Sequence, residues 1–278
     1  ARAFQGEIVA LMVFALFFGW ALSTVIKSEQ HPLSQVLDAI FQACMKIIEL
    51  AMKLAPYAIF GIVFNTAYRM GAGFLGNVAY YALVVVLGLL FQFFVVYGLT
   101  LKIVGKVSPF HFFSQCKQVY LYAFSTASSN ATLPVALETA EHVLKLPPKI
   151  SRFVLTVGAS ANQNGTALFE GVTVIFLAQV FGIDLSFGQQ VLVVLMSVLA
   201  GVGTAGVPGG SLPLIVVLMV QVGIPAEGIG LILGVDRFLD MCRTTLNVAG
   251  DLVIARLITS SVEQKDIDSI QDEAEQAA

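Results

Sequence analysis

Long apolar runs dominate this sequence, and several of them are long enough to cross a lipid bilayer. A membrane-spanning α-helix needs about 20 apolar residues, and the runs at 7–26 and 76–104 reach that length. Three more runs, at 150–183, 185–225 and 227–259, are interrupted by polar, glycine or proline residues. Because backbone groups in lipid must find their partners within the protein, the sequence predicts an all-α polytopic membrane protein.

The composition supports this class. Only 12% of the 278 residues are charged and 57% are hydrophobic, whereas soluble domains carry about 25% charged residues. The three cysteines are scattered and form neither a metal-binding nor a disulfide pattern. The net charge of −3 says little about partners, and we expect the lipid bilayer as a partner and no nucleic acid.

Two segments have the pattern of helices that turn back within the membrane. Residues 109–143 are interrupted by STASSNATLP (125–134), and residues 185–225 are interrupted by GVGTAGVPGGS (201–211). Each arm, of roughly 12–17 residues, is too short to span a bilayer. We therefore predict two re-entrant helical hairpins, whose tips are buried in protein or line a watery cavity.

Each predicted hairpin is followed by a span with its own polar interruption. The first is NQNGT (162–166), within the broken helix 150–183, and the second is the opening stretch of the polar helix 227–260. Paired interrupted segments in two halves of a chain are typical of transporters with inverted repeats, whose binding site lies at mid-membrane. The predicted fold class is thus an inverted-repeat transporter core with two hairpins and discontinuous helices.

Charge predicts the orientation of the spans. Basic residues gather at one set of span ends, and the positive-inside rule assigns that side to the cytoplasm. The first hairpin then enters from the inside and the second from the outside, and the polar tail 261–278 is cytoplasmic. We expect a multi-pass protein of the cell inner (plasma) membrane. The basic residues on this side are Lys27, Lys46, Lys53, Lys102, Lys106, Lys145, Lys149 and Arg152.

Five polar residues in 234–251 recur at spacings of four, three, four and four. On an α-helix such spacings form one stripe over about 22 Å, and ionisable groups at bilayer depth are costly, roughly 3 kcal/mol each on insertion scales. One interpretation is a structural ladder of ion pairs. The other is a binding site, because an arginine fork suits a carboxylate and an aspartate accepts from an ammonium group. The stripe consists of Asp236, Asp240, Arg243, Asn247 and Asp251.

The far end of the stripe offers oxygen ligands. Asn247 and Asp251, with Asn162 and Asn164 of the NQNGT break, carry the amide and carboxylate oxygens that hard cations prefer. Gly165 breaks its helix and frees backbone carbonyls to join them. One end of the stripe therefore suits an organic anion, such as an acidic amino acid, and the other an inorganic cation. This is the chemistry of coupled transport.

Four motifs together resemble the glutamate transporter family, the dicarboxylate/amino acid:cation symporters. They are SSNATLP (128–134), NQNGTALFEG (162–171), GTAGVPGG (203–210) and DRFLDMCRTTLNVAGD (236–251). The resemblance covers essentially the whole chain and implies a secondary transporter, not an enzyme. It also implies that the sequence corresponds to the family from its fourth span onward, without the first three spans.

The resemblance implies a role for each residue of the substrate site. Arg243 binds the side-chain carboxylate of the substrate and Asp240 binds its amino group. Thr244 and Asn247, with Ser128 and Ser129 at the first tip, hold the main-chain carboxylate. The second tip acts as the lid, through Gly206, Val207, Pro208 and Gly209.

The resemblance also implies cation sites. One sodium lies among Asn162, Asn247, Asp251 and the carbonyl of Gly158, and a second uses carbonyls near Ser160 and Thr204. Three residues depart from the usual family pattern, because Asn164 stands for an aspartate at an ion site, Gln163 for a methionine and Gly201 for a serine. Fewer fixed negative charges imply weaker or fewer sodium ions.

Proton coupling is the open alternative. Glu170 matches the position of a proton-carrying glutamate in the animal excitatory amino acid transporters. Apolar surroundings favour the protonated form of a glutamate, which suits a proton carrier. A buried acid paired with a backbone group is the other interpretation of Glu170.

The domain organisation follows from the same resemblance. Residues 1–70 are expected to be scaffold and trimerisation helices, residues 71–260 the transport domain that moves as an elevator, and residues 261–278 a cytoplasmic tail. We expect a homotrimer. Asp240 favours aspartate or glutamate over a plain dicarboxylate, because a plain diacid has no ammonium group to pair with it.

Three other functions are alternatives. An intramembrane aspartyl protease needs one aspartate from each of two helices, whereas Asp236, Asp240 and Asp251 lie on a single helix with Arg243 between them. An anion-conducting channel is a second alternative. A folded fragment that no longer transports is the third.

Overall fold

The computed structural model describes residues 8–25, 31–70, 72–204 and 206–276, although not every side chain within these ranges. All regular structure in these ranges is helical, which confirms the all-α prediction. The chain divides into two compact units. Unit 1 comprises residues 1–76 and 227–234, and unit 2 comprises residues 77–226 and 235–278.

Unit 1 contains two long helices. Helix α1 runs over Ile8–Val25 and α2 over Pro32–Met70. Large hydrophobic side chains such as Trp20 and Tyr68 are exposed. The predicted first span, 7–26, corresponds to α1, and its end residues lie outside the described ranges, as do residues 277–278 of the predicted tail.

Unit 2 starts within a nearly continuous helical rod. The rod is formed by α3 (Ala72–Phe91), a π-helical segment (Gln92–Tyr97) and α4 (Gly98–Ile103). Among the described residues, the helical stretches Gly76–Ile103 and Leu233–Val262 are the two that are long and apolar enough to cross a membrane by length and composition. The rod is fixed to α9 (Asn164–Val180) by the hydrogen bond between the Tyr81 and Thr173 hydroxyl groups, at 2.7 Å.

The first interrupted segment has a shorter break than the sequence predicts. It contains α5 (Pro109–Gln115), α6 (Lys117–Thr126), α7 (Ser129–Glu138) and a π-helical turn (Thr139–Val143). Cys116 separates α5 from α6, and Ala127 and Ser128 are the only residues between α6 and α7, whereas the predicted break is 125–134. The reason is local: Ala127 is left-handed, with φ of 50°, and the Ser128 hydroxyl caps α7 by accepting from the Ala131 N–H at 3.2 Å.

The break within 150–183 is also short, whereas the break within the second interrupted segment, 185–225, is wider. Helices α8 (Pro148–Ala161) and α9 are separated by Asn162 and Gln163, because Asn164 already belongs to α9. Helices α10 (Phe187–Gly203) and α11 (Leu212–Gln221) are separated by residues 204–211. The wider tip follows from its composition, since glycine-rich sequence disfavours a helix.

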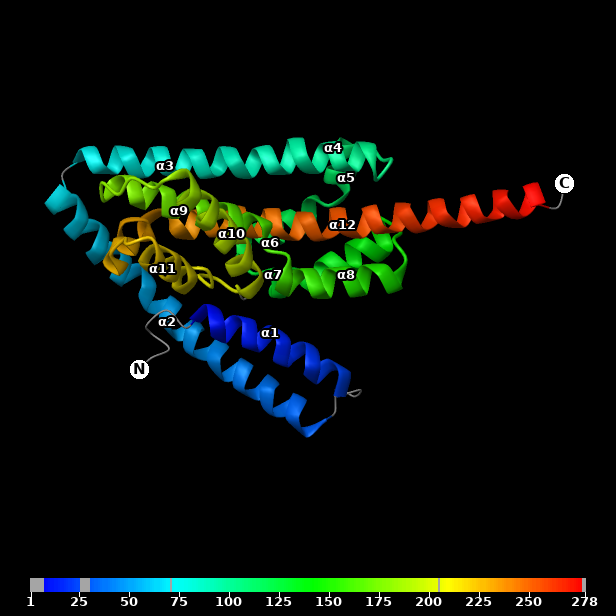
Figure 1. Cartoon of the computed structure of the whole chain (residues 1–278), viewed down its shortest axis with the longest axis horizontal. Coiled ribbons are helices and arrows are strands. Elements are labelled where there is room, and N and C mark those ends of the chain that lie inside the picture. Colours follow the sequence, from blue (N-terminus) through cyan, green and yellow to red (C-terminus); the bar gives the residue numbers. More distant parts are fainter. Residues whose placement is uncertain (1–7, 26–30, 71, 205, 277–278) are drawn as a thin grey trace. The chain divides into compact units, whose positions relative to one another are not determined.

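Helix α12 (Leu233–Gln276) is the longest element. It begins later than the predicted start at residue 227, because Ala226–Leu231 forms a 3-10 turn with two glycines. In Figure 1, α12 runs along unit 2 in orange and red. Helix α9 packs against α10 and α11, and apolar residues of α12 such as Leu239, Leu246 and Leu252 are buried.

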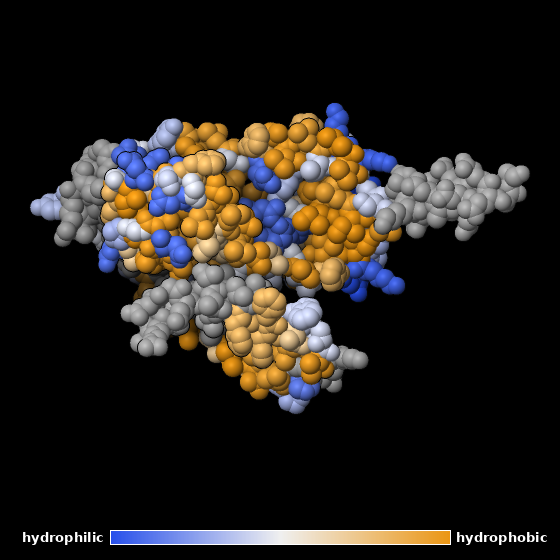
Figure 2. Space-filling model, viewed as in Figure 1, coloured by the Kyte–Doolittle hydropathy of each residue, from blue (hydrophilic) through white to orange (hydrophobic). Residues whose placement is uncertain are grey.

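The surface of unit 2 is mostly apolar on the face that Figure 2 shows, with hydrophilic residues gathered in separate clusters. Large side chains including Phe110, Phe153 and Phe187 are exposed. Exposed apolar area on this scale is rare in soluble monomers and marks a surface that meets lipid or protein.

Candidate site on the polar face of α12

The five polar residues of α12 all point away from the surface. Their exposed fractions lie between 2% for Arg243 and 7% for Asp236, so the stripe faces the interior of unit 2. We call Asp236, Asp240 and Arg243 the anion end. The cation end comprises Asn247 and Asp251 with Asn162 and Asn164, which lie at the α8–α9 break.

Arg243 is the centre of the anion end. Its Nε donates to Asp240 Oδ1 at 2.9 Å, and its Nη1 lies 3.5 Å from Asp236 Oδ1. The guanidinium group also lies over the Phe169 ring, 4.3 Å from the centroid, in cation–π geometry. Within the described part of the chain, Nη1 nevertheless has no hydrogen-bond partner. Among the described residues, this nitrogen is therefore held by the ion pair with Asp236 and not by a hydrogen bond.

The two tips predicted as hairpin tips meet above Arg243. The Ser128 hydroxyl donates to the Gly206 carbonyl at 2.8 Å, and the Asn130 N–H donates to the same oxygen at 3.3 Å. Gly206 has no room for a side chain, since a Cβ would lie 2.6 Å from the Ala159 carbonyl oxygen. The Gly209 N–H donates to Asp240 Oδ2 at 2.9 Å. The second tip is thus tied both to the first tip and to α12.

A small cavity lies between the tips and the anion end. Its volume is about 10 Å³, roughly the space of one water molecule, so an amino acid does not fit in it as it stands. Seven residues predicted for substrate or cation binding line it: Ser129, Thr204, Gly206, Val207, Asp240, Arg243 and Thr244. Gln163, Thr166, Gly210 and Ser211 complete the lining.

At the cation end, amide groups bond to one another. Asn247 Oδ1 accepts from the Gly165 N–H at 2.7 Å, and its Nδ2 donates to Gln163 Oε1 at 2.6 Å and to the Thr166 hydroxyl at 3.2 Å. Asn247 is therefore already engaged on both sides of its amide. It does not line the small cavity, although it was predicted to help hold the substrate.

Asp251 and Asn162 pair with each other at the cation end. Asn162 Nδ2 donates to Asp251 Oδ1 at 2.6 Å. The Asp251 carboxylate lies so close to Gly158 that a Cβ there would clash with it, and the Gly158 carbonyl accepts from the Asn162 N–H at 2.9 Å. Gly158, Asn162 and Asp251 are thus brought together.

Asn164 contacts a residue that the sequence analysis missed. Its Nδ2 donates to the Tyr97 hydroxyl at 2.9 Å, and that hydroxyl lies 3.5 Å from the Leu246 carbonyl. Tyr97 closes the π-helical segment of the rod, and π-helical turns are frequent at functional sites. A tyrosine within an apolar run gives no signal in the sequence. In the structure, the π-helical segment that ends at the buried Tyr97 marks this position.

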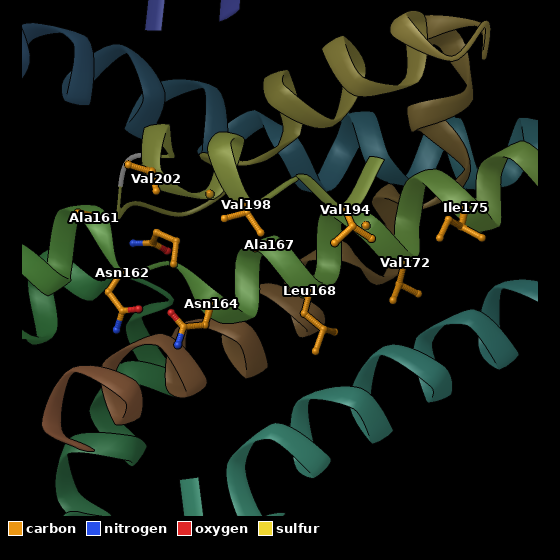
Figure 3. Close-up of a pocket in the computed structure, with 13 residues that line it drawn as sticks. Ala161, Asn162, Asn164, Ala167, Leu168, Val172, Ile175, Val194, Val198 and Val202 are labelled. Atoms are coloured by element: carbon orange, nitrogen blue, oxygen red, sulfur yellow. The ribbon is translucent and has the colours of Figure 1, made fainter. Parts of the chain in front are cut away.

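A larger cleft reaches the cation end within unit 2. It has a volume of about 620 Å³ and lies between α9 and α10. Figure 3 shows Val194 and Val198 of α10 facing α9 across it, with Asn162 and Asn164 at one end. The cleft is apolar along its length and polar only at that end.

Two further predicted positions differ in their surroundings. Ser160 is exposed, whereas Thr204 is buried and donates to the Ala200 carbonyl at 3.0 Å.

Glu170 is fully buried, and neither of its carboxyl oxygens has a hydrogen-bond partner among the described residues. The described residues also hold no cluster of three or more His, Cys, Asp or Glu side chains suited to a metal. The predicted cation ligands are instead mostly amide and carbonyl oxygens.

Comparison with known proteins gives a family match. The profile of the sodium:dicarboxylate symporter family matches residues 1–261. The chain is 35% identical over 261 residues to the proton/glutamate-aspartate symporter of Escherichia coli K12, a match that covers 94% of the chain and 59% of that protein. It is 34% identical over 251 residues to the proton/sodium-glutamate symport protein of Bacillus subtilis 168, covering 90% and 58%.

An animal relative is equally similar. Excitatory amino acid transporter 1 of Rattus norvegicus is 35% identical over 252 residues, which cover 90% of the chain and 46% of the transporter. The chain therefore spans about half the length of the curated relatives it matches. The family and these relatives are membrane transporters, which agrees with a multi-pass membrane protein that is not an enzyme.

Proposed function

The chain belongs to the sodium:dicarboxylate symporter family, and we propose that it forms the substrate-binding core of a secondary transporter for acidic amino acids. The observation that carries the proposal is the anion end. A buried arginine, whose Nη1 has an ion pair with Asp236 but no hydrogen-bond partner in the described part of the chain, lines a small cavity with residues of both tips, and a planar arginine fork is suited to a carboxylate.

Asp240 supports an amino acid over a plain dicarboxylate. Its Oδ2 accepts from the Gly209 N–H. When the second tip moves away, this oxygen loses its donor, and the ammonium group of an amino acid replaces it. A plain dicarboxylate offers no such donor and leaves this oxygen without a hydrogen bond, with the Arg237 guanidinium 4.0 Å away as its remaining partner, which is unfavourable in a buried site.

The cation end supports coupling to sodium. Asp251, the carbonyl of Gly158 and the amides of Asn162 and Asn247 supply the oxygen ligands that a hard cation prefers. Thr204 and Ser160 are the proposed ligands of a second sodium. Asn164 lacks the charge of an aspartate, so we expect weak sodium binding or few sodium ions.

Glu170 is the proposed proton carrier. Its carboxyl group is buried on α9 without hydrogen-bond donors in the described part of the chain, and such surroundings disfavour a charged carboxylate. Proton transport through Glu170 and sodium binding at Asp251 are separable by experiment, because the two residues lie at different sites.

The remaining proposals concern the whole transporter. The segments 109–143 and 185–225 are proposed to be re-entrant hairpins of an inverted repeat, and unit 2 to move as an elevator against a scaffold that includes 1–70. A homotrimer in the cell inner (plasma) membrane, with a cytoplasmic C-terminus, completes the proposal. A channel and a binding core without transport remain the alternative functions.

The test combines binding and transport. The purified protein in lipid nanodiscs is titrated with L-aspartate in sodium chloride and in choline chloride, and proteoliposomes are assayed for aspartate uptake under sodium or proton gradients. Binding that Arg243→Ala abolishes and Arg152→Ala preserves supports the proposal. Arg152 is a matched control because its ion pair with Glu141 lies at the surface, with 69% of the arginine side chain exposed.

The outcomes separate the alternatives. Sodium-driven uptake supports coupling at Asp251, and proton-driven uptake supports Glu170. Binding without uptake identifies a binding core, and the absence of aspartate binding contradicts the proposed function.

A further inference from the structure

Three serines of unit 2 bury a hydroxyl group that has no hydrogen-bond partner among the residues that the structure describes. They are Ser129, Ser197 and Ser211. Ser129 already has a predicted role at the first tip. Ser197 lies on α10 beside Gly171 and lines neither cavity. Ser211 has no predicted role, is only 1% exposed and lines the small cavity with Arg243.

Ser211 occupies the N-cap position of α11 but does not cap it. An N-cap serine normally accepts from the N–H of the second or third helical residue. Here the second residue is Pro213, which has no N–H, and the third is Leu214, whose N–H donates to the Ser211 carbonyl at 3.0 Å. The Ser211 hydroxyl is therefore left for another partner.

The surroundings of this hydroxyl favour an anion. It lies at the N-terminus of α11, where the helix dipole is positive, and Ser211 lines the same cavity as Arg243, whose Nη1 has no hydrogen-bond partner in the described part of the chain. The cavity has room for about one water molecule, so groups that line it lie within reach of a single ligand group. Asp240 also lines this cavity, but its two oxygens already accept from Arg243 Nε and from the Gly209 N–H.

We propose that the Ser211 hydroxyl donates to the side-chain carboxylate of the substrate beside Arg243, and that Ser211 is a specificity-determining residue for acidic over neutral amino acids. The inference rests on the proposed function, and it adds a residue from the second tip to the carboxylate site. The same movement that opens the tip then carries one of the carboxylate donors away from Arg243.

The test compares three serine variants with two ligands. Ser211→Ala, Ser129→Ala and Ser197→Ala are each titrated with L-aspartate and, by competition, with L-asparagine at saturating sodium. Asparagine replaces the side-chain carboxylate with an amide and keeps the main-chain groups. Ser197→Ala is the matched control for the removal of a buried, unbonded hydroxyl.

The expected result is specific to one ligand. Ser211→Ala lowers aspartate affinity about tenfold, as expected for a lost hydrogen bond to a charged group, and leaves asparagine affinity within about twofold. Ser129→Ala weakens both ligands to a similar extent, and Ser197→Ala weakens neither. Equal behaviour of Ser211→Ala and Ser197→Ala overturns the inference, and so does an equal loss of both ligands in Ser211→Ala. If the unmodified protein does not bind aspartate, the proposed function itself is wrong.

Discussion

The two ends of the polar face of α12 satisfy their polar groups in different ways. At the anion end, Arg243 Nη1 and Asp236 Oδ1 form an ion pair at 3.5 Å, and neither has a hydrogen-bond partner in the described part of the chain. At the cation end, Asn162, Asn164, Asn247 and Asp251 all bond to neighbouring groups of the protein. The anion end therefore has buried polar atoms without hydrogen bonds, whereas the polar groups of the cation end bond to neighbouring groups of the protein.

The difference has an energetic consequence. A buried polar group without a hydrogen bond is unfavourable by about 1–3 kcal/mol. The ion pair between Arg243 and Asp236 offsets part of this cost, and a carboxylate that accepts from Arg243 Nη1 relieves the rest. A cation at the Asp251 site must instead replace the hydrogen bond from Asn162. We therefore expect that sodium binding, which must replace an existing hydrogen bond, is less favoured by the structure without ligands than substrate binding is.

Removal of the central charge gives the largest expected effect. Arg243→Gln removes the fork and leaves Asp236 and Asp240 without their buried counter-charge, which typically destabilises a protein by about 3–5 kcal/mol. Aspartate affinity should fall at least about 100-fold. Thermal unfolding and isothermal titration measure the two effects, with Arg152→Gln as the control. A variant that retains both stability and affinity would show that the anion end binds no carboxylate.

Removal of the cation-end carboxylate should affect the other ligand. Asp251→Asn keeps the shape of the side chain and removes its charge, so the sodium concentration that half-saturates aspartate binding should rise at least about tenfold. Affinity for aspartate at saturating sodium should change much less. Equal sodium dependence in the variant and the unmodified protein contradicts a cation site at Asp251.

Addition of a carboxylate should sharpen the contrast in the opposite direction. Asn164→Asp adds a negative charge at the cation end, and the Tyr97 hydroxyl is placed to donate to it. Sodium affinity should increase by a factor of about three to ten, measured as the sodium dependence of aspartate binding. A decrease in sodium affinity argues that Asn164 contacts no cation.

The smallest effect is expected at Tyr97. Tyr97→Phe removes the acceptor of the Asn164 amide and should lower the free energy of unfolding by about 1 kcal/mol. Aspartate affinity at saturating sodium should stay within about twofold, because Tyr97 does not line the small cavity. Chemical unfolding of the two proteins in the same detergent measures the change. A large loss of aspartate affinity would mean that the two ends are strongly coupled.

The sequence predicted the polar face of α12 because helix geometry alone places residues at these spacings on one side. The cost of charge at bilayer depth then indicated that this side faces inward. The lengths of the helix breaks were predicted less well. The residues SNATLP look like a turn by composition, but Ser128 caps a helix that begins at once and contains Pro134.

The contacts of the site depend on long-range packing that no local pattern records. Asn247 pairs with Gln163, 84 positions away, and Asn164 with Tyr97, 67 positions away. Ser211 did have a local signal. A serine directly before a leucine–proline pair is an N-cap whose second helical residue cannot donate, so its hydroxyl is free to serve elsewhere.

The contact between the two tips limits how evolution can adjust it. The acceptor at the second tip is the backbone carbonyl of Gly206, so no substitution at that position can delete it, and the nearby Ala159 carbonyl leaves no space for a larger residue. Substitutions can therefore change the hydrogen bond between the Ser128 hydroxyl and the Gly206 carbonyl only at the donor, Ser128. Selection for faster or slower opening of the tips should therefore accumulate changes in the first segment and leave the second tip unchanged.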